Sequence, residues 1–175
     1  MSRGFVVPDD LEPVTRAADA PPAGTRLFHN RGCYGCGPDS PNGLHLDVLA
    51  GSAADAHVEI TVATTHLGGP GVIHGGILAS VFDESMGLAV PLAAGAIGVT
   101  VALSVDYSRP VPLGARVRFD VAVLGRAGRK VYTAGVARVV DDGGASESAL
   151  GAEVSAARAL FVLIDPRSHF RLDRT

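Results

Sequence analysis

One stretch of the chain, His74–Gly87, reads HGGILASVFDESMG and limits the fold more than any other. Two glycines precede a run of apolar residues, and the carboxylates Asp83 and Glu84 stand in the middle of that run. A helix that is hydrophobic on all sides is buried inside a protein, and a buried carboxylate is costly unless it is paired or has a chemical role. The stretch therefore predicts one buried helix, from about Gly75 to Leu92, with Pro91 tolerated only near its end.

The spacing within this helix predicts how two groups act on one ligand. Asp83 lies nine residues after His74, which is about 13 Å along the axis and nearly on the opposite face. Gly75 and Gly76 let a ligand approach the first free N–H groups of the helix, where the dipole favours negative charge. One carbonyl group cannot contact both the helix start and Asp83 of the same chain. Joint action on an acyl group therefore requires a second, antiparallel copy of the helix, as in a two-fold dimer with shared sites.

The composition is that of a globular protein with one domain. The chain has 175 residues, 47% of them hydrophobic, and a formal net charge of −3, whereas nucleic-acid binding needs a basic excess. No run of about 18 uncharged apolar residues is present to span a membrane, and the first residues, MSRGFVVPDDLEP, lack the apolar segment of a secretory signal. Two cysteines imply no disulfide framework. We expect a cytoplasmic location, with neither nucleic acid nor membrane as a partner.

The rest of the chain divides into an arm, a domain and a tail. Residues 1–25 contain four prolines and no sustained period, so we expect an extended or mobile arm on the domain surface. Residues 26–165 form the predicted domain and residues 166–175 the tail. Six segments read as strands separated by turns around Gly125–Gly128 and Asp141–Gly144: Leu44–Ala50, His57–Ala63, Gly98–Tyr107, Arg116–Leu124, Lys130–Val140 and Ala156–Ile164. The predicted class is α+β, with an antiparallel sheet curled around the long helix.

Three ordered pieces of the sequence resemble a known family. They are HGGILASVFDESMG, then VTVALSVDYSRPVPLG (Val99–Gly114), then GRKVY (Gly128–Tyr132). Together they resemble the hotdog-fold acyl-CoA thioesterases of the PaaI-like branch, over roughly Leu27 to Ile164. The resemblance implies a long central helix wrapped by a curved antiparallel sheet, and a homodimer through edge strands that often doubles to a tetramer. It implies acyl-CoA as the substrate, and we expect no cofactor.

The resemblance also assigns roles by position. The catalytic carboxylate falls on Asp83, the helix-start donor on Gly75 with His74 beside it, and the hydroxyl that supports the carboxylate on Thr100. The implied substrate-binding positions are Gly76, Asp106, Ser108, Arg109, Arg129, Lys130, Val131, Tyr132, Thr133 and Ala134. Ser108 stands where a basic residue would bind phosphate better, so phosphate binding is expected to depend more on Arg109, Arg129 and Lys130.

Two charged or titratable residues of the helix segment keep alternative interpretations. His74 can be a general base, but a histidine before a glycine pair often caps a helix, and a structural or substrate-orienting role is favoured. Glu84 is one position round the helix from Asp83 and cannot share its direction. We therefore expect Glu84 to be an inter-subunit or solvent-facing charge.

The segment Cys33-Tyr34-Gly35-Cys36 has the spacing of half a zinc site. A structural zinc needs four ligands, and there is no second cysteine pair, although His29 and His45 could supply the rest. A glycine-rich turn packed near the pocket is the favoured interpretation, and we expect no metal.

The predicted function is hydrolysis of an acyl-CoA thioester to a free acid and CoA. The Gly75 N–H of one subunit would stabilise the oxyanion, while Asp83 of the facing subunit would act as a general base or as a nucleophile. One alternative is a hotdog enoyl-CoA hydratase, which commonly uses an Asp–His pair on the helix, whereas no histidine follows the start of this helix. The other is a non-catalytic acyl-CoA-binding protein, which would not need Asp83.

Overall fold

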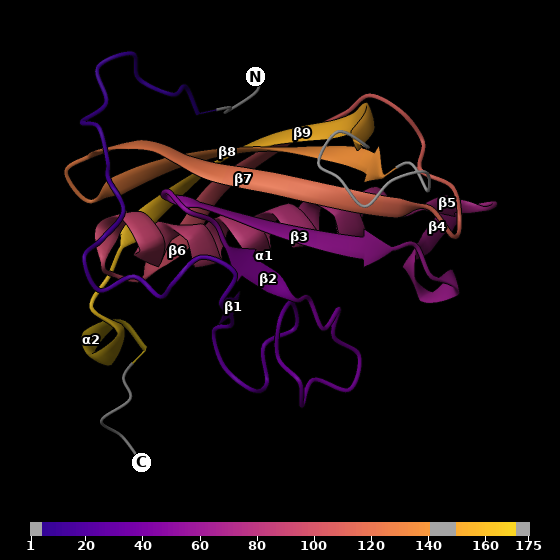
Figure 1. The fold of residues 1–175 in the computed structure, drawn as a ribbon, viewed down its shortest axis with the longest axis horizontal. Coiled ribbons are helices and arrows are strands. Elements are labelled where there is room, and N and C mark those ends of the chain that lie inside the picture. Colours follow the sequence, from indigo (N-terminus) through magenta and orange to yellow (C-terminus); the bar gives the residue numbers. More distant parts are fainter. Residues whose placement is uncertain (1–4, 141–149, 171–175) are drawn as a thin grey trace.

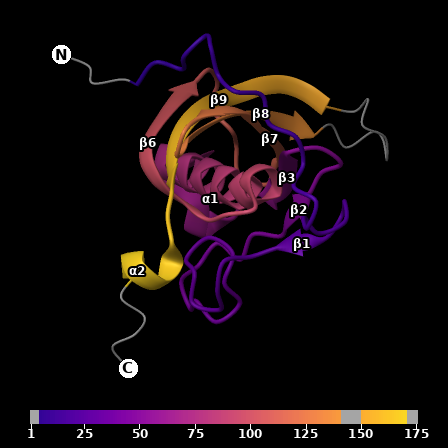
Figure 2. The same cartoon turned by 90° about the vertical axis from the view of Figure 1, so that its left-hand side faces the viewer.

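A seven-stranded antiparallel sheet wraps around one long helix, α1 (Gly75–Ala94), in the computed structural model of the chain. The structure describes residues 5–140 and 150–170. Figure 1 shows α1 lying beneath the long strands, and Figure 2, which looks nearly along the helix, shows the strands curving around it. The predicted α+β class, with a curved antiparallel sheet around a central helix, is confirmed.

The sheet order is β1-β2-β3-β7-β8-β9-β6, so the strand after the helix, β6, lies at one edge beside β9. A separate small hairpin, β4 with β5, stands just before the helix. The bounds of the elements are β1 Arg26–Leu27, β2 Val48–Ala50, β3 Asp55–Thr61, a 3-10 turn Thr64–His66, β4 Leu67–Gly69, β5 Val72–Ile73, β6 Gly98–Tyr107, β7 Arg116–Ala127, β8 Lys130–Val140, β9 Leu150–Leu163 and α2 Pro166–Phe170.

Both ends of α1 are capped by residues suited to the task. His74 precedes the first turn in an extended conformation, and its side chain accepts a hydrogen bond from the Gly76 N–H. Gly95 ends the helix at φ 60°, a left-handed conformation that glycine adopts without steric cost. By length and composition α1 could cross a membrane, but here it is the core helix, with Phe82 packed edge-on against Phe119 of β7 at a centroid distance of 4.9 Å.

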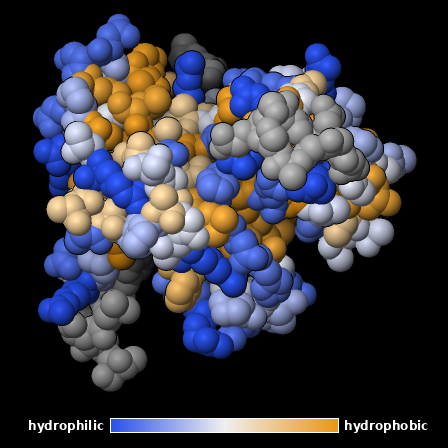
Figure 3. Space-filling view, viewed as in Figure 1, coloured by the Kyte–Doolittle hydropathy of each residue, from blue (hydrophilic) through white to orange (hydrophobic). Residues whose placement is uncertain are grey.

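Buried and exposed residues alternate along the long strands, as expected for a sheet that packs one face on a helix. In β7 the buried positions Val117, Phe119, Val121 and Val123 follow each other at a spacing of two. Edge strand β6 differs, because Val101 and Tyr107 are large apolar residues that are more than half exposed. The face of the molecule in Figure 3 mixes hydrophilic and hydrophobic residues.

Several boundaries differ from those predicted. Strand β2 covers only the last part of the predicted strand 44–50, β9 begins six residues earlier than predicted, and the very short strands β1, β4 and β5 were not expected. The expected turn at Gly125–Gly128 is instead a bulge in β7 followed by a two-residue turn at Gly128 and Arg129. The turn predicted at 141–144 lies outside the described residues.

The described part of the arm, residues 5–25, lies along the domain (Figure 1). The backbones of Glu12 and Arg126 exchange two hydrogen bonds, and the Ala17 N–H donates to the Leu92 carbonyl near the end of α1. The Arg16 guanidinium donates to the carbonyls of Gly51 and Ala53 at 2.7 and 2.6 Å. These contacts tie the arm to both the sheet and the helix.

Candidate functional site

Asp83 and Thr100 form a hydrogen-bonded pair beside the sheet edge. The Thr100 hydroxyl donates to Asp83 Oδ1 at 2.8 Å, because the short link after α1 brings the beginning of β6 back along the helix. The two side chains line a hollow of about 320 Å³ together with Ala79, Ser80 and Leu103. Asp83 is half-buried and Thr100 is exposed, so a small molecule can reach the carboxylate from solvent.

The start of α1 presents one amide without a partner. His74 Nδ1 accepts from the Gly76 N–H at 2.8 Å, so Gly76 has no N–H to offer a ligand in this arrangement. The same bond uses the lone pair of Nδ1 and makes His74 a helix cap rather than a base at that nitrogen. Among the residues that the structure describes, the Gly75 N–H has no hydrogen-bond acceptor. It points outward at the positive end of the helix dipole.

Tyr107, at the end of β6, closes one side of the helix start and was missed by the sequence analysis. Its hydroxyl donates to the Gly75 carbonyl at 3.0 Å, and its ring lies 3.3 Å from where a Cβ on residue 75 would be. A side chain at residue 75 would therefore require the Tyr107 ring to move by a few tenths of an ångström. A hollow of about 300 Å³ lies here, lined by Val72, Ile73, Gly75, Leu78, Tyr107, Ser108, Arg109, Pro110 and Val111.

The two hollows are well separated within one chain. Gly75 and Asp83 are eight residues apart on one helix, about 12 Å along its axis. Thr100 and Tyr107 are seven residues apart on one strand, about 23 Å. Both hollows lie along β6, whose outer side pairs with no strand among the described residues. Asp83 and Thr100 thus line one hollow, and Gly75 lines the other.

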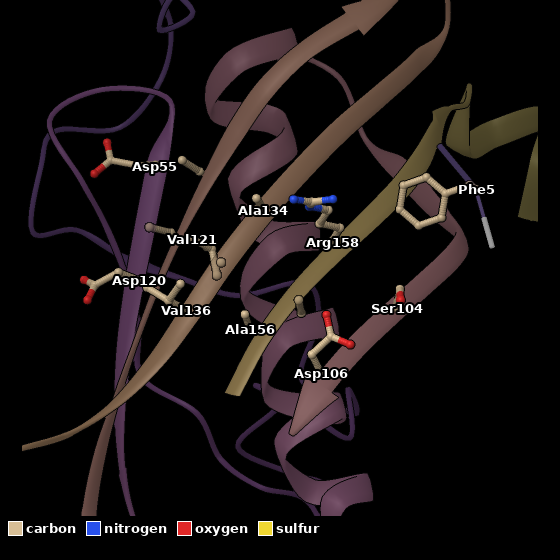
Figure 4. A pocket seen from close by; sticks show the side chains of 14 residues that line it. Phe5, Asp55, Ser104, Asp106, Asp120, Val121, Ala134, Val136, Ala156 and Arg158 are labelled. Atoms are coloured by element: carbon tan, nitrogen blue, oxygen red, sulfur yellow. The ribbon is translucent and has the colours of Figure 1, made fainter. Parts of the chain in front are cut away.

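Six of the predicted substrate-binding residues fall in three places at the surface. Ser108 and Arg109 line the hollow at the helix start. Arg129 and Lys130 are exposed at the β7–β8 turn, at the Thr100 end of the sheet, where Phe161 of β9 pairs with Val131 on one side and Thr100 on the other. Asp106 and Ala134 line a hollow of about 600 Å³ on the outer face of the sheet, away from the helix (Figure 4). That hollow contains neither Asp83 nor Gly75.

Three predicted contacts belong to the interior of this chain. The side chains of Val131, Tyr132 and Thr133 are at most 4% exposed. Strand β8 lies between β7 and β9 in the middle of the sheet, and Phe5 of the arm packs near the Tyr132 ring. Their side chains contribute to the core of this chain, and substrate binding at these three positions stays a prediction.

Glu84 is also placed differently from the expectation of a solvent-facing or inter-subunit charge. It is only 9% exposed, and its Oε1 lies 2.9 Å from His29 Nδ1. The hydrogen bond to Glu84 raises the pKa of His29. Burial acts to raise the pKa of Glu84, but the hydrogen bond with His29 and its neighbours outweighs burial and holds that pKa below its usual range. Both shifts favour an ionised pair inside the protein.

Comparison with known proteins agrees with this geometry. Residues 70–146 match the family model described as the thioesterase superfamily. A crystal structure of a thioesterase superfamily protein superposes with a TM-score of 0.65 at 27% identity, covering 75% of this chain and 60% of that one. The chain has the hotdog fold, and its residues 70–146 are similar to the thioesterase superfamily.

Other similar proteins are longer than this chain or less similar to it in sequence. Acyl-coenzyme A thioesterase THEM4 of Xenopus laevis is 38% identical over 99 residues, which are 57% of this chain and 40% of that protein. A conserved protein from Pseudomonas aeruginosa has a TM-score of 0.57 at 26% identity, covering 68% and 88% of the two chains. An acyl-CoA hydrolase from Staphylococcus aureus, solved with butyryl coenzyme A, coenzyme A and coenzyme A disulfide, has a TM-score of 0.59 at 19% identity, covering 64% and 66%. The chain thus spans less than half of the length of the frog thioesterase.

Proposed function

We propose that this protein is an acyl-CoA thioesterase that hydrolyses a thioester to a free acid and CoA. The observation that carries the proposal is the division of the site: an unpaired helix-start amide at Gly75 and the Asp83–Thr100 pair lie in two hollows along the same exposed strand edge. A carbonyl-polarising donor and a water-activating carboxylate are the two parts that acyl hydrolysis needs. Neither hollow contains both parts.

A two-fold dimer through β6 would complete the site. Within residues 5–140 and 150–170, no strand pairs with the outer edge of β6, which exposes Val101 and Tyr107. Such an edge is a template for strand pairing with another chain. If two copies of β6 pair in antiparallel fashion, the Thr100 end of one copy lies beside the Tyr107 end of the other. Asp83 of one subunit would then face Gly75 of its partner, and an isologous interface would form two equal sites.

The same pairing would assemble the CoA-binding residues. Within one chain, Arg129 and Lys130 lie at the Thr100 end of the sheet, whereas Ser108 and Arg109 lie at the Tyr107 end. Antiparallel pairing of β6 would place the basic turn of one subunit on the same side as Arg109 of the other. These exposed cations would hold the phosphates of CoA at the surface, while the thioester enters between the two helices.

The proposed chemistry uses the Gly75 N–H of one subunit and the Asp83 carboxylate of the other. The Gly75 N–H, aided by the helix dipole, would donate a hydrogen bond to the thioester oxygen and stabilise the negative charge that develops there. Thr100 holds Asp83 Oδ1, which leaves Oδ2 to take a proton from water or to attack the carbonyl and form a mixed anhydride. In either route the CoA thiolate leaves and takes up a proton. In the base route the water oxygen enters the free acid directly. In the nucleophile route water hydrolyses the anhydride, and attack at the aspartyl carbonyl leaves the water oxygen in Asp83 and passes the original Asp83 oxygen to the free acid.

The comparisons support the proposal through names and ligands of other proteins. The frog relative is named an acyl-coenzyme A thioesterase, and the Staphylococcus aureus hydrolase was solved with CoA compounds. Membership of the PaaI-like branch, a tetramer built as a dimer of dimers, and a cytoplasmic location stay predictions.

The test is release of free thiol from short, medium, long and aryl acyl-CoAs by the wild-type protein and by Asp83→Asn. We expect thiol release from at least one substrate, and its loss in the variant. Addition of water across an enoyl-CoA without thiol release would instead identify a hydratase, and tight binding of acyl-CoA without any turnover would identify a binding protein. A single turnover in ¹⁸O-labelled water would put the label in Asp83 only if this carboxylate is the nucleophile.

A further inference from the structure

Four side chains with metal-binding atoms meet beside α1, outside the proposed hydrolytic site. His29, Cys33 and Cys36 come from the loop between β1 and β2, and Glu84 comes from the helix. Their nitrogen, sulfur and carboxylate atoms all lie within 4.8 Å of one another. We infer that these four residues form a structural site for one Zn²⁺ ion, which fastens the loop to the central helix.

The distances between the four groups are close to those of a tetrahedral site. The Cys33 Sγ lies 3.4 and 3.6 Å from the two oxygens of Glu84, and His29 Nδ1 lies 4.0 Å from each sulfur. With the usual zinc–ligand bond lengths, ligand atoms at the corners of a tetrahedron are about 3.4 to 3.8 Å apart. The His29–Glu84 separation of 2.9 Å is shorter than this range, and it requires an opening of about half an ångström to admit the ion.

The loop already has the shape that such a site needs. The backbone N–H of His29 donates to Cys36 Sγ at 3.1 Å, and the Gly37 N–H donates to the Cys33 carbonyl at 2.9 Å. Gly35 stands between the cysteines, and a Cβ there would lie 2.4 Å from Glu84 Oε2. A glycine at this position is therefore what lets the carboxylate reach the two sulfurs.

The donor set and its burial favour zinc in a structural role. Two thiolates, an imidazole and a carboxylate suit Zn²⁺, which takes four ligands in a closed tetrahedral site. Cys36 is fully buried and Glu84 nearly so, while the His29 side chain is 33% exposed and gives the ion a path from solvent. No fifth position is needed, so the ion would stabilise the fold rather than take part in catalysis.

The second histidine considered for this motif serves as an internal control. His45 is exposed, and its Nδ1 lies 3.0 Å from the Gly37 carbonyl rather than near the sulfurs. It stands at φ 49°, a conformation that asparagine also tolerates. His45→Asn therefore removes an imidazole from the same loop without removing a zinc ligand.

The first measurement needs no variant. The untagged protein, produced with zinc in the medium and kept reduced, should contain about one zinc ion per chain by mass spectrometric metal analysis. After chelation, Co²⁺ should restore binding with thiolate charge-transfer bands and the intense visible bands of tetrahedral cobalt. Zinc far below one per chain after reconstitution, a Cys33–Cys36 disulfide in the reduced preparation, or an octahedral cobalt spectrum would each overturn the inference.

The variants then identify the ligands. Loss of a residue that only supports a ligand typically weakens metal binding about 10–100-fold, so Cys33→Ser and His29→Ala should each weaken zinc affinity by at least about 100-fold in competition with a chelator. His45→Asn should bind zinc as the wild type does. Circular dichroism and gel filtration establish that each variant is folded. Equal zinc affinity in all three variants would refute this ligand set.

Discussion

The neighbouring carboxylates Asp83 and Glu84 lie on the same helix but differ in burial and in hydrogen-bond partner. Asp83 is half-buried, opens onto a hollow beside the sheet edge and is held by Thr100. Glu84 is nearly buried beneath the loop that carries the two cysteines and is paired with His29. A rotation of about 100° between successive helix residues separates them. Proximity in sequence therefore says little about role, which depends on what the rest of the chain brings to each face.

The largest expected effect is that of Asp83→Asn. The amide keeps the shape of the carboxylate but cannot act as a base or nucleophile, so kcat should fall by about 10²-fold or more, while the protein still folds and dimerises. Steady-state thiol release and gel filtration are the measurements. Turnover within a few-fold of the wild type would show that Asp83 does not carry the chemistry.

Glu84→Gln should act in the opposite way, on stability more than on turnover. Loss of a buried, charged hydrogen-bond acceptor costs about 1–3 kcal/mol, which in a chain of this size lowers the melting temperature by several degrees. Calorimetry measures the shift. Asp47→Asn is the matched control, because Asp47 pairs with Arg26 at the surface and such pairs contribute little. Equal shifts in the two variants would contradict the structural role of Glu84.

The central helix and the surroundings of Asp83 could be predicted from the sequence better than the surroundings of Glu84. An apolar run with internal carboxylates identifies a core helix by itself, and family resemblance pointed to Thr100. The partner of Glu84 lies 55 positions away, and no local pattern shows which loop covers that face. Tyr107 was missed for the same reason, because its contact with Gly75 depends on how β6 lies against the helix.

Local sequence patterns also do not predict the strand boundaries or the burial of residues in β8. Val131, Tyr132 and Thr133 follow a turn with basic residues, a setting that fits a ligand-binding edge as well as a central strand. Only the pairing of β8 with both β7 and β9 shows that they are interior.

Thr100→Val should lower kcat/KM by less than the loss of Asp83 does, because it removes only the partner of this carboxylate. It removes the hydroxyl that donates to Oδ1, and loss of one hydrogen bond to a charged group should lower kcat/KM about tenfold. Thr100→Ser keeps the hydroxyl and should retain most of the activity. Equal kcat/KM values for the valine and serine variants would mean that the hydrogen bond does not position Asp83 for reaction.

The smallest effect is expected for the exposed turn. Replacing Arg129 and Lys130 together by alanine should raise KM for acyl-CoA several-fold with little change in kcat, because a remote phosphate contact is made equally in the ground and transition states. The effect should shrink at high salt and vanish for a short acyl thioester without the nucleotide. An equal response from that short substrate would refute phosphate binding at this turn.

The central claim, that each active site needs two subunits, is tested most directly by mixing two inactive variants. Asp83→Asn removes the carboxylate, and Gly75→Pro removes the N–H at the first helical position, where proline is tolerated. Gly75→Ala, which keeps the N–H, controls for crowding against the Tyr107 ring 3.3 Å away. After mild dissociation and mixing, half of the dimers should be hybrids with one intact site, so activity should recover to about a quarter of the wild type. No recovery despite hybrids confirmed by native mass spectrometry, or a fully active monomer, would contradict the shared site.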